Sequence, residues 1–292
     1  MATTTTVISQ KVNNPWIDAL RRMFRNRAVA LSAIFLGLLI NVAIAAPLLV
    51  PYDPEAPDFD HIRETPTANH LLGTDEIGRD TLSRVIYGAR ISLYVGIVVQ
   101  TVSTFIGITL GLIAGFYGGF LDLAIMRAVD IMYALPNFLF AVFMVSILKP
   151  TTASVILTLI LAGWPFSARL MRGQVLATKQ EEYVVAAQAI GAQKRQIMLR
   201  HVLPNSLTPI IIQFTIGIAG VIMAEAGLSF LGIGIRPPTP TWGGMINKGR
   251  EFIRSSPHLA IYPSIVLGLT MIAFNFIGDG LRDALDPRMN NR

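Results

Sequence analysis

Residues 91–116 read ISLYVGIVVQTVSTFIGITLGLIAGF and contain no charged side chain. A helix needs about 20 apolar residues to cross the ~30 Å hydrocarbon core of a bilayer, so this stretch predicts a transmembrane helix. We therefore expect an all-α, polytopic membrane protein with six transmembrane helices. The other five runs of suitable length and low charge are 28–50, 121–148, 152–171, 206–230 and 259–278.

The composition agrees with this fold class. Of the 292 residues, 52% are hydrophobic and only 14% are charged, which is too apolar for an ordinary water-soluble domain. The formal charge of +6 would suit a nucleic-acid partner, but the basic residues lie between long apolar runs. That placement favours a role in membrane orientation and argues against nucleic acid. The absence of cysteine excludes disulfides and thiolate metal sites.

The distribution of Lys and Arg predicts the orientation. Most of the Lys and Arg residues outside the spans lie in the first tail, the fourth connection and the last tail. Residues 51–90, in contrast, hold eight acids against four arginines. Because cytoplasmic segments carry the excess of basic residues, both termini are expected in the cytoplasm. The first run also resembles a signal peptide with cleavage after Ala45, but its apolar stretch continues to Val50, which favours a retained anchor. Pro136 is expected to kink the third span.

The connection between the fourth and fifth spans is patterned as two short helices. Residues 181–205 read EEYVVAAQAIGAQKRQIMLRHVLPN, and Gly191 stands where a helix would end in a left-handed cap. The first helix predicts one apolar stripe backed by acids. From the pattern alone, a hairpin on the membrane surface and a docking element for a partner are equally favoured. The stripe and its acids comprise Glu181, Glu182, Tyr183, Ala186, Ala187 and Ile190.

This segment resembles the cytoplasmic loop of permease subunits in ATP-binding-cassette importers. The resemblance implies that the loop, residues 172–205, forms coupling helices that seat in a groove of the ATPase subunit. Because Val185 replaces the glutamate of the family pattern, Glu181 or Glu182 would have to supply a carboxylate there. The family pattern of Glu-Ala-Ala, Gly and a later Leu-Pro corresponds to Val185, Ala186, Ala187, Gly191, Leu203 and Pro204.

Three longer blocks extend the resemblance over most of the chain. They read HLLGTDEIGRDTLSRVIYGARISL before the second span, AEAGLSFLGIGIRPPTPTWGGMI after the fifth, and NFIGDGLRDALDPR at the end. The blocks are similar to those of the second permease in the dipeptide, oligopeptide and nickel importer group. The resemblance therefore implies the type I importer permease fold and half of a translocation pathway for peptides, with a nickel chelate or glutathione as the alternative cargo.

The resemblance also implies partners, a location and a division of the chain. The expected partners are a second homologous permease, two ATPases that bind ATP and Mg²⁺, and an extracytoplasmic solute-binding protein, in a prokaryotic plasma (inner) membrane. The expected units are a cytoplasmic tail (1–27), the first span (28–50), an extracytoplasmic segment with an interfacial helix (51–90), a core permease domain (91–284) and a cytoplasmic tail (285–292).

Two outer segments have two interpretations each. Residues 73–90 predict a surface helix with Thr74 as its cap. The loop from 232 to 258 contains Pro237, Pro238 and Trp242, which suit an interfacial lid and anchor. Given the resemblance, both segments would equally help to seat a solute-binding protein.

Small residues recur at every fourth position of the run 91–116 and so share one helix face. Such a ridge lets another helix pack backbone to backbone. The pattern leaves open internal packing, a seam with a partner permease and, as a third option, a pathway lining. The ridge consists of Ser103, Gly107, Gly111 and Gly115.

Ionisable residues inside the predicted spans need partners, because an unpaired charge at mid-membrane costs about 2.5–3.5 kcal/mol. Arg127 and Asp130 are three residues apart on one helix face and predict a structural ion pair. Glu225, near the outer end of the fifth span, is predicted either to line the translocation route or to reach the headgroups.

The sequence contains no pattern for catalysis or nucleotide binding. A phosphate-binding loop needs a lysine after glycine, and none of the five lysines follows one. All four histidines lie outside the predicted spans, and no His-Glu-x-x-His occurs. We therefore expect no catalytic residue, metal or cofactor on this chain, and ATP bound by another polypeptide.

Two rival classes make different demands on the sequence. A stand-alone secondary transporter would couple to an ion through buried carboxylates such as Asp130 or Glu225. The sequence has no evident internal repeat, however, and that class gives the cytoplasmic hairpin no purpose. A structural membrane adaptor would explain the hairpin and the glycine ridge but not the long outer blocks.

Overall fold

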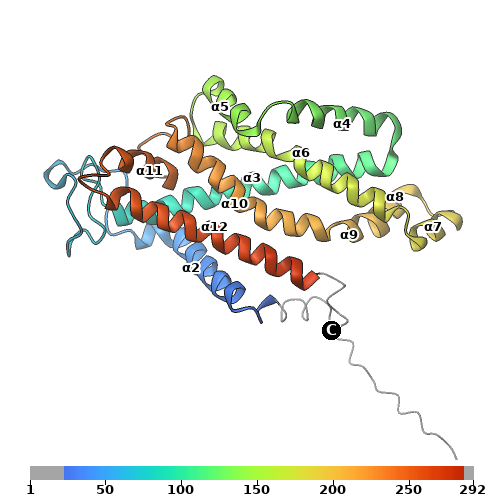
Figure 1. Ribbon diagram of the computed structural model, residues 1–292, viewed down its shortest axis with the longest axis horizontal. Coiled ribbons are helices and arrows are strands. Elements are labelled where there is room, and N and C mark those ends of the chain that lie inside the picture. The colour runs from blue at the N-terminus through green and yellow to red at the C-terminus, as the bar shows by residue number, and fades with distance from the viewer. Residues whose placement is uncertain (1–22, 286–292) are drawn as a thin grey trace, which may run out of the picture.

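The computed structural model describes residues 23–285, and all regular structure within them is helical (Figure 1). α4 (Gly119–Tyr133) and α5 (Asn137–Leu148) form one further candidate span, bent by 83°. The predicted tails, 1–27 and 285–292, lie mainly outside the described residues. The five helices long and apolar enough to cross a membrane are α2 (Arg27–Leu49), α3 (Thr81–Tyr117), α6 (Thr152–Thr178), α10 (Thr208–Phe230) and α12 (His258–Leu285).

Shorter elements gather at the two ends of the molecule. Figure 1 shows α11 and the loops after α2 at one end, which we call the loop end, and α7 and α8 at the other, the hairpin end. The hairpin (182–206) is the whole segment from α7 to α9. The short elements are η1 (Phe59–His61), α7 (Glu182–Ala189), α8 (Lys194–Ile197), η2 (Met198–Val202), α9 (Leu203–Ser206) and α11 (Trp242–Glu251).

The helix that contains 91–116 begins earlier than predicted, at Thr81. Asp80 caps it, because one carboxylate oxygen accepts hydrogen bonds from the backbone N of Ser83 at 2.8 Å and from Ser83 Oγ at 2.7 Å. The predicted surface helix over 73–90 with Thr74 as its cap is therefore wrong. Its helical part forms the first turns of α3, and the Thr74 hydroxyl donates to the carbonyl of His61, the last residue of η1.

The third predicted span is broken, not merely kinked. Pro136 has φ −56° and ψ 124°, and α5 begins anew at the next residue. Proline has no N–H to donate and disfavours helical geometry in the residue before it, so the α4 ladder cannot continue through this point. The kinked span predicted over 121–148 is thus two separate helices, and α4 runs beside α6 (Figure 1).

α3 is the central helix of the bundle. It packs on α6 along one face and on α2 and α10 along others. Val95 and Val99 on α3 are fully buried against α5, α6 and α10 in one cluster, and Ala89 and Leu93 join a second cluster with α2, α10 and α12. The ends of this central helix therefore connect the loop end with the hairpin end.

Candidate functional site

The first helix of the hairpin ends in a two-bond cap. The backbone N of Gly191 donates to the carbonyl of Gln188 at 3.0 Å, and the N of Ala192 donates to the carbonyl of Ala187 at 3.1 Å. Gly191 has φ +80°, the left-handed conformation that this cap requires and that glycine adopts without strain. The structure thus has the left-handed cap that the sequence predicts at Gly191.

α7 has one buried face and one exposed apolar stripe. Val184 and Ala187 are buried in a cluster with side chains of α3, α6 and α10. Beside this buried pair, Tyr183 is 44% exposed and Ile190 is 85% exposed. Large apolar side chains gathered on a surface outside the spans indicate a protein contact. Of the other pattern residues, Leu203 is half-buried, and those exposed are Glu181, Glu182, Ala186 and Pro204.

The hairpin is tied to the ends of α3 and α6. Lys179, just after α6, donates from Nζ to the carbonyls of Phe116 at 2.7 Å and Gly115 at 3.3 Å. These carbonyls lie in the last turn of α3, where a cation is favoured by the helix dipole. Thr178 and Ser206 join the two ends of the connection by a hydroxyl contact of 3.1 Å. Sequence reasoning counted Lys179 only as a basic residue, because its acceptors are distant in the chain.

The small-residue ridge of α3 packs against α6 of the same chain. Ser103 Oγ donates to the carbonyl of Ile160 at 3.3 Å. A β-carbon added to Gly115 would lie 2.9 Å from the Val175 β-carbon, and one added to Gly107 or Gly111 would overlap the α6 backbone near Ala168. Of the options that the sequence left open, the structure selects internal packing.

The predicted pairing of Arg127 with Asp130 is wrong. Asp130 accepts from Arg169 of α6 at 2.6 Å, and the Arg169 guanidinium lies 4.6 Å from the Tyr133 ring centroid. α4 runs beside α6, so a partner across the two helices competes with the neighbour on the same helix. Arg127 makes no ion pair within residues 23–285.

A second ion pair strengthens the link between α4 and α6. Arg172 forms a two-pronged contact with Asp122, with Nε and Nη2 lying 2.5 and 2.6 Å from the two carboxylate oxygens. This bidentate geometry is the strongest form of such a pair. The signal for it was available in the sequence, since Asp122 is an acid at the start of a predicted span.

Glu225 neither lines an open route nor reaches the headgroups in this structure. Its side chain is fully buried between α10 and α3. Ser229 Oγ donates to one carboxylate oxygen at 2.8 Å, and Ser92 Oγ lies 3.4 Å from the other. A buried carboxyl group held by hydroxyls is a structural element of the loop end.

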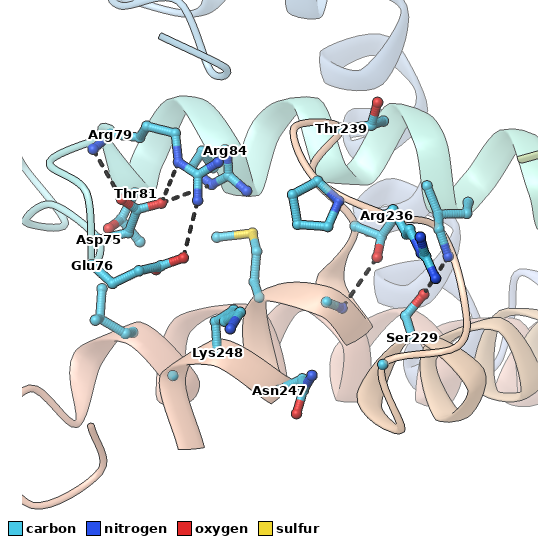
Figure 2. Close-up of a pocket in the computed structure, with 18 residues that line it drawn as sticks. Asp75, Glu76, Arg79, Thr81, Arg84, Ser229, Arg236, Thr239, Asn247 and Lys248 are labelled. Atoms are coloured by element: carbon cyan, nitrogen blue, oxygen red, sulfur yellow. Dashed lines mark hydrogen bonds and ion pairs between the residues drawn. The ribbon is translucent and has the colours of Figure 1, made fainter. Parts of the chain in front are cut away.

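A cavity of about 370 Å³ opens at the loop end (Figure 2). It lies between the first turn of α3, the helix α11, and the loop that follows α10. Four basic and two acidic side chains line this loop-end cavity. Arg79 Nε lies 2.7 Å from Asp75, and its Nη2 lies 3.2 Å from Glu76. Arg84 lies 3.3 Å from Asp75 and donates to the carbonyl of Pro54 at 2.6 Å. Both arginines are buried and belong to the wall.

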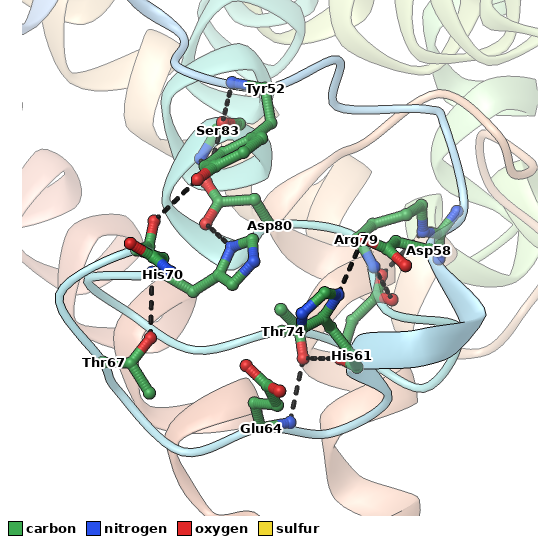
Figure 3. A network of polar contacts seen from close by, with 12 residues as sticks. Tyr52, Asp58, His61, Glu64, Thr67, His70, Thr74, Arg79, Asp80 and Ser83 are labelled. Atoms are coloured by element: carbon green, nitrogen blue, oxygen red, sulfur yellow. Dashed lines mark hydrogen bonds and ion pairs between the residues drawn. The ribbon is translucent and has the colours of Figure 1, made fainter.

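A polar network beside this cavity ties the segment after α2 to the start of α3 (Figure 3). One carboxylate oxygen of Asp80 caps α3, and His70 Nδ1 lies 3.0 Å from the other oxygen. Both side chains are buried. The backbone N of Tyr52 donates to Ser83 Oγ at 3.2 Å, and the Tyr52 and His70 rings lie 4.7 Å apart. The network fixes the loop end, and sequence reasoning missed it because its members are far apart in the chain.

Trp242 does not act as an interfacial anchor. Its side chain is fully buried, and its Nε1 donates to the carbonyl of Val85 at 3.1 Å. It holds α11 onto α3, and a β-carbon added to Gly88 would come within 3.2 Å of the indole ring. α11 is therefore a fixed wall of the loop-end cavity.

Two family descriptions match the sequence. Residues 107–291 match the family described as binding-protein-dependent transport system inner membrane component. Residues 14–66 match the N-terminal transmembrane domain of oligopeptide transport permease C. The first match spans the hairpin and both flanking helices.

Relatives over the full length of the chain are known. A glutathione transport system permease protein of Pectobacterium atrosepticum is 42% identical over 292 residues, covering 100% of this chain and 97% of that protein. A dipeptide transport system permease protein of Alkalihalophilus pseudofirmus is 40% identical over 278 residues, covering 95% and 91%. Among solved structures, a chain of the inward-facing MetNI methionine ABC transporter has a TM-score of 0.58 at 18% identity, covering 70% of this chain and 97% of that one.

Proposed function

Because this chain belongs to the family of binding-protein-dependent transport system inner membrane components, and is thus a permease subunit of an ATP-binding-cassette importer, we propose that it forms one half of a peptide-translocating pathway. The other half is a second homologous permease, and two separate ATPase subunits bind ATP and Mg²⁺. The observation that best supports this function is the exposed apolar stripe of α7, which lies on a hairpin that packs against the spans.

The contacts of the hairpin suit it to transmit force. An ATPase that holds Tyr183 and Ile190 would displace α7 as it closes on ATP. Since Val184 and Ala187 are packed among side chains of α3, α6 and α10, and Lys179 holds the last turn of α3, that displacement moves the ends of three spans together. Interfaces packed this tightly shift as rigid units, which suits alternating access. This subunit carries out no covalent chemistry.

Orientation follows from the same assignment. The hairpin faces the cytoplasm, where ATP is available, and the loop end faces outward. α12 begins beside α11 at the loop end and returns to the side where α2 starts, since a β-carbon on Gly280 would come within 2.8 Å of Val29. This arrangement and the excess of basic residues support a position of both termini in the cytoplasm. The compartment is the prokaryotic plasma (inner) membrane.

The cargo that we propose is a di- or oligopeptide. Relatives of similar identity are a dipeptide permease and a glutathione permease, so the shared chemistry is a short chain of amide-linked amino acids with free carboxylates. Glutathione is the alternative within this class, and a nickel chelate is the alternative outside it. An extracytoplasmic solute-binding protein delivers the cargo to the loop end.

The test is purification of the tagged chain in mild detergent, with mass spectrometry of what co-purifies and an ATPase assay. We expect two cassette ATPases and a second permease. The complex is then placed in nanodiscs and screened against solute-binding proteins of the same organism, each loaded with a dipeptide, glutathione or a nickel chelate. The loaded protein that raises the ATPase rate identifies both the delivery partner and the cargo.

A chain that elutes alone, folded and without ATPase activity, contradicts this function. Uptake into vesicles driven by an ion gradient, in the absence of any ATPase, would then favour a secondary transporter. ATPase stimulation with glutathione alone, and none with dipeptides, would replace the general peptide cargo by the alternative.

A further inference from the structure

A second cavity, of about 400 Å³, lies at the hairpin end, and we call it the hairpin-end cavity. Phe116 and Tyr117 of α3 line it together with Lys194 and Ile197 of α8. α8 lies near the turn from α3 into α4, whereas α7 reaches farther out (Figure 1). The cavity is therefore placed between the span ends and the hairpin, on the bilayer side of α7.

The hairpin-end cavity is basic. Lys179 and Lys194 line it, and no acidic side chain within residues 23–285 does. Lys194 is exposed and makes no ion pair in the part of the chain that the structure describes. Lys179 donates to two carbonyls of α3, but an ammonium group has three N–H donors, so one is left for a further acceptor. The cavity therefore offers positive charge and donors to an oxyanion.

The depth of the cavity matches the headgroup layer of a bilayer. The charge-free run 91–116 ends at Phe116, which lies in the cavity wall. As a helix this run is about 39 Å long, at 1.5 Å for each residue. A bilayer with its headgroups is about 40–45 Å thick, so a helix of this length that starts in one headgroup layer ends in the other. The two lysines therefore lie at the level of lipid phosphates.

Exposed aromatic and apolar side chains follow the cavity wall directly in the chain. Tyr117 in the wall is 50% exposed, and Phe120 and Leu123 in the first turns of α4 are 80% and 54% exposed. Aromatic rings favour the interface between headgroups and hydrocarbon. A free phosphate ion would use the lysines but not these side chains. The combination suits a molecule that carries an anionic group on a hydrocarbon chain.

We propose that the hairpin-end cavity binds the phosphate of an anionic phospholipid headgroup, as in phosphatidylglycerol, through Lys179 and Lys194. Basic pockets between membrane helices on the cytoplasmic side bind anionic headgroups in the same way. The bound phosphate connects the end of α6, through Lys179, with α8, through Lys194, and so holds the hairpin to the spans. The lipid site goes beyond the proposed function, because it depends on the membrane and not on the cargo or the ATPases.

The first test is native mass spectrometry of the full chain in detergent, titrated with phosphatidylglycerol or with zwitterionic phosphatidylcholine. We expect the parent chain to bind phosphatidylglycerol about tenfold more tightly, because two lysines favour the net negative headgroup. Lys194→Ala should raise the Kd for phosphatidylglycerol about fivefold, the effect of one basic residue at a membrane surface, and leave the Kd for phosphatidylcholine unchanged.

Two variants control for general charge and for folding. Arg200→Ala removes an exposed basic side chain of the same hairpin that does not line the cavity, so its Kd for phosphatidylglycerol should match that of the parent. Lys194→Arg keeps the charge and should retain the preference for phosphatidylglycerol. Lys179 is left in place, because its removal would also release the last turn of α3.

A second measurement tests whether the lipid holds the hairpin to the spans. Hydrogen exchange is followed on the complex in nanodiscs with and without phosphatidylglycerol. We expect the anionic lipid to slow exchange over residues 192–202 in the parent protein and not in Lys194→Ala. Residues 232–241 at the loop end are the internal control and should exchange at the same rate in both lipids.

Four outcomes overturn the proposal. The parent chain can bind both lipids equally, or Arg200→Ala can weaken binding as much as Lys194→Ala. Free glycerol phosphate can compete at concentrations near the Kd of the lipid, which would assign the cavity to a soluble phosphate. Binding can also disappear when the ATPase subunits are attached, which would show that they cover the cavity. A chain that keeps its lipid preference but binds no ATPase contradicts the proposed function alone, so the two failures are distinguishable.

Discussion

Single glycines on α3 set how closely it approaches α6. A β-carbon on Gly111 would lie 2.8 Å from the Met171 β-carbon and nearer still to the carbonyl oxygen of Ala168, and that backbone cannot swing away. We expect Gly111→Val to lower the stability of the purified protein by about 1–3 kcal/mol, the usual cost of overpacking. Thermal unfolding in detergent measures this as a lower midpoint.

Gly220 on α10 is the matched control for that substitution. A β-carbon there meets nothing within 4 Å, and the residue is exposed. Gly220→Val should therefore leave the unfolding midpoint close to that of the parent protein. Equal midpoints for both variants would show that the approach of α3 to α6 is looser than the structure has it.

The pair of His61 and Asp58 makes the loop end sensitive to pH. The hydrogen bond that His61 Nδ1 donates to the Asp58 carboxylate, at 2.9 Å, raises the pKa of His61 above its ordinary 6.5, and the same bond lowers the pKa of Asp58 below 3.8. Because the pKa of His61 is higher in the folded state, its protonation stabilises the folded loop. This contribution is fully present below pH 6.5 and is lost as pH rises through the folded pKa. Because the pKa of Asp58 is lower in the folded state, its ionised carboxylate stabilises the folded loop. This contribution is fully present above pH 3.8 and is lost as pH falls through the folded pKa of Asp58.

NMR titration of histidine-labelled protein in nanodiscs tests this prediction. We expect Asp58→Asn to return the pKa of His61 towards 6.5. Glu55→Gln, which changes an exposed acid of the same segment that does not contact His61, should have no such effect. A His61 pKa that is insensitive to Asp58→Asn contradicts the pairing.

Residue patterns could predict which faces are special but not what they meet. Spacing placed the ridge of Gly107, Gly111 and Gly115 on one face of α3, yet its partner helix follows only from tertiary packing. In the same way, Asp130 had a partner of correct charge nearby in sequence, and the competing Arg169 lies 39 residues away in the chain. Long-range partners of this kind leave no periodic signal.

At the scale of elements, the turn at Gly191 decides whether α7 presents its stripe. Nothing lies within 4 Å of a β-carbon built there, so a substitution acts only through the backbone, whose φ is +80°. Valine is disfavoured in this conformation and asparagine tolerates it. We expect Gly191→Val to abolish peptide uptake and ATPase stimulation while membrane insertion stays intact, and Gly191→Asn to retain most of both.

Uptake assays on reconstituted vesicles, with insertion checked by carbonate extraction, compare the two variants. Normal uptake by Gly191→Val would contradict the role of the hairpin in coupling. Equal loss in both variants would mean that the side chain at this position disturbs the partner contact itself, and that the left-handed cap is not the sensitive feature.

Elements with a strong local cause were predictable, and those shaped by packing were less so. The apolar runs predicted the spans, and Gly191 predicted the end of α7. Pro136 signalled a disturbance in the third span, but its size, 83° between α4 and α5, depends on how both helices rest on α6. The start of α3 at Thr81 was missed because Asp80 and Thr74 are both suitable N-cap residues by sequence. Only the polar network of the loop end shows that Asp80 is the cap.

For the whole molecule, composition and the long blocks predicted the fold class and the family, and the two ends then follow from chain connectivity. What no pattern predicted is the shape of the loop end. Its cavity joins residues near 80, 236 and 248, which are far apart in the chain and come together only in the packed bundle. The loop-end cavity is therefore a property of the assembled bundle.

Labelling of single introduced cysteines tests which end of the molecule faces the cytoplasm. The chain has no cysteine, so a single introduced cysteine reports one position without background. Gln180 at the hairpin end and Ser255 at the loop end are both exposed. In intact cells, we expect a membrane-impermeant maleimide to label Ser255→Cys at once and Gln180→Cys only after permeabilisation. The reverse pattern would turn the hairpin away from ATP and the loop end away from any external binding protein, and the proposed function would fail.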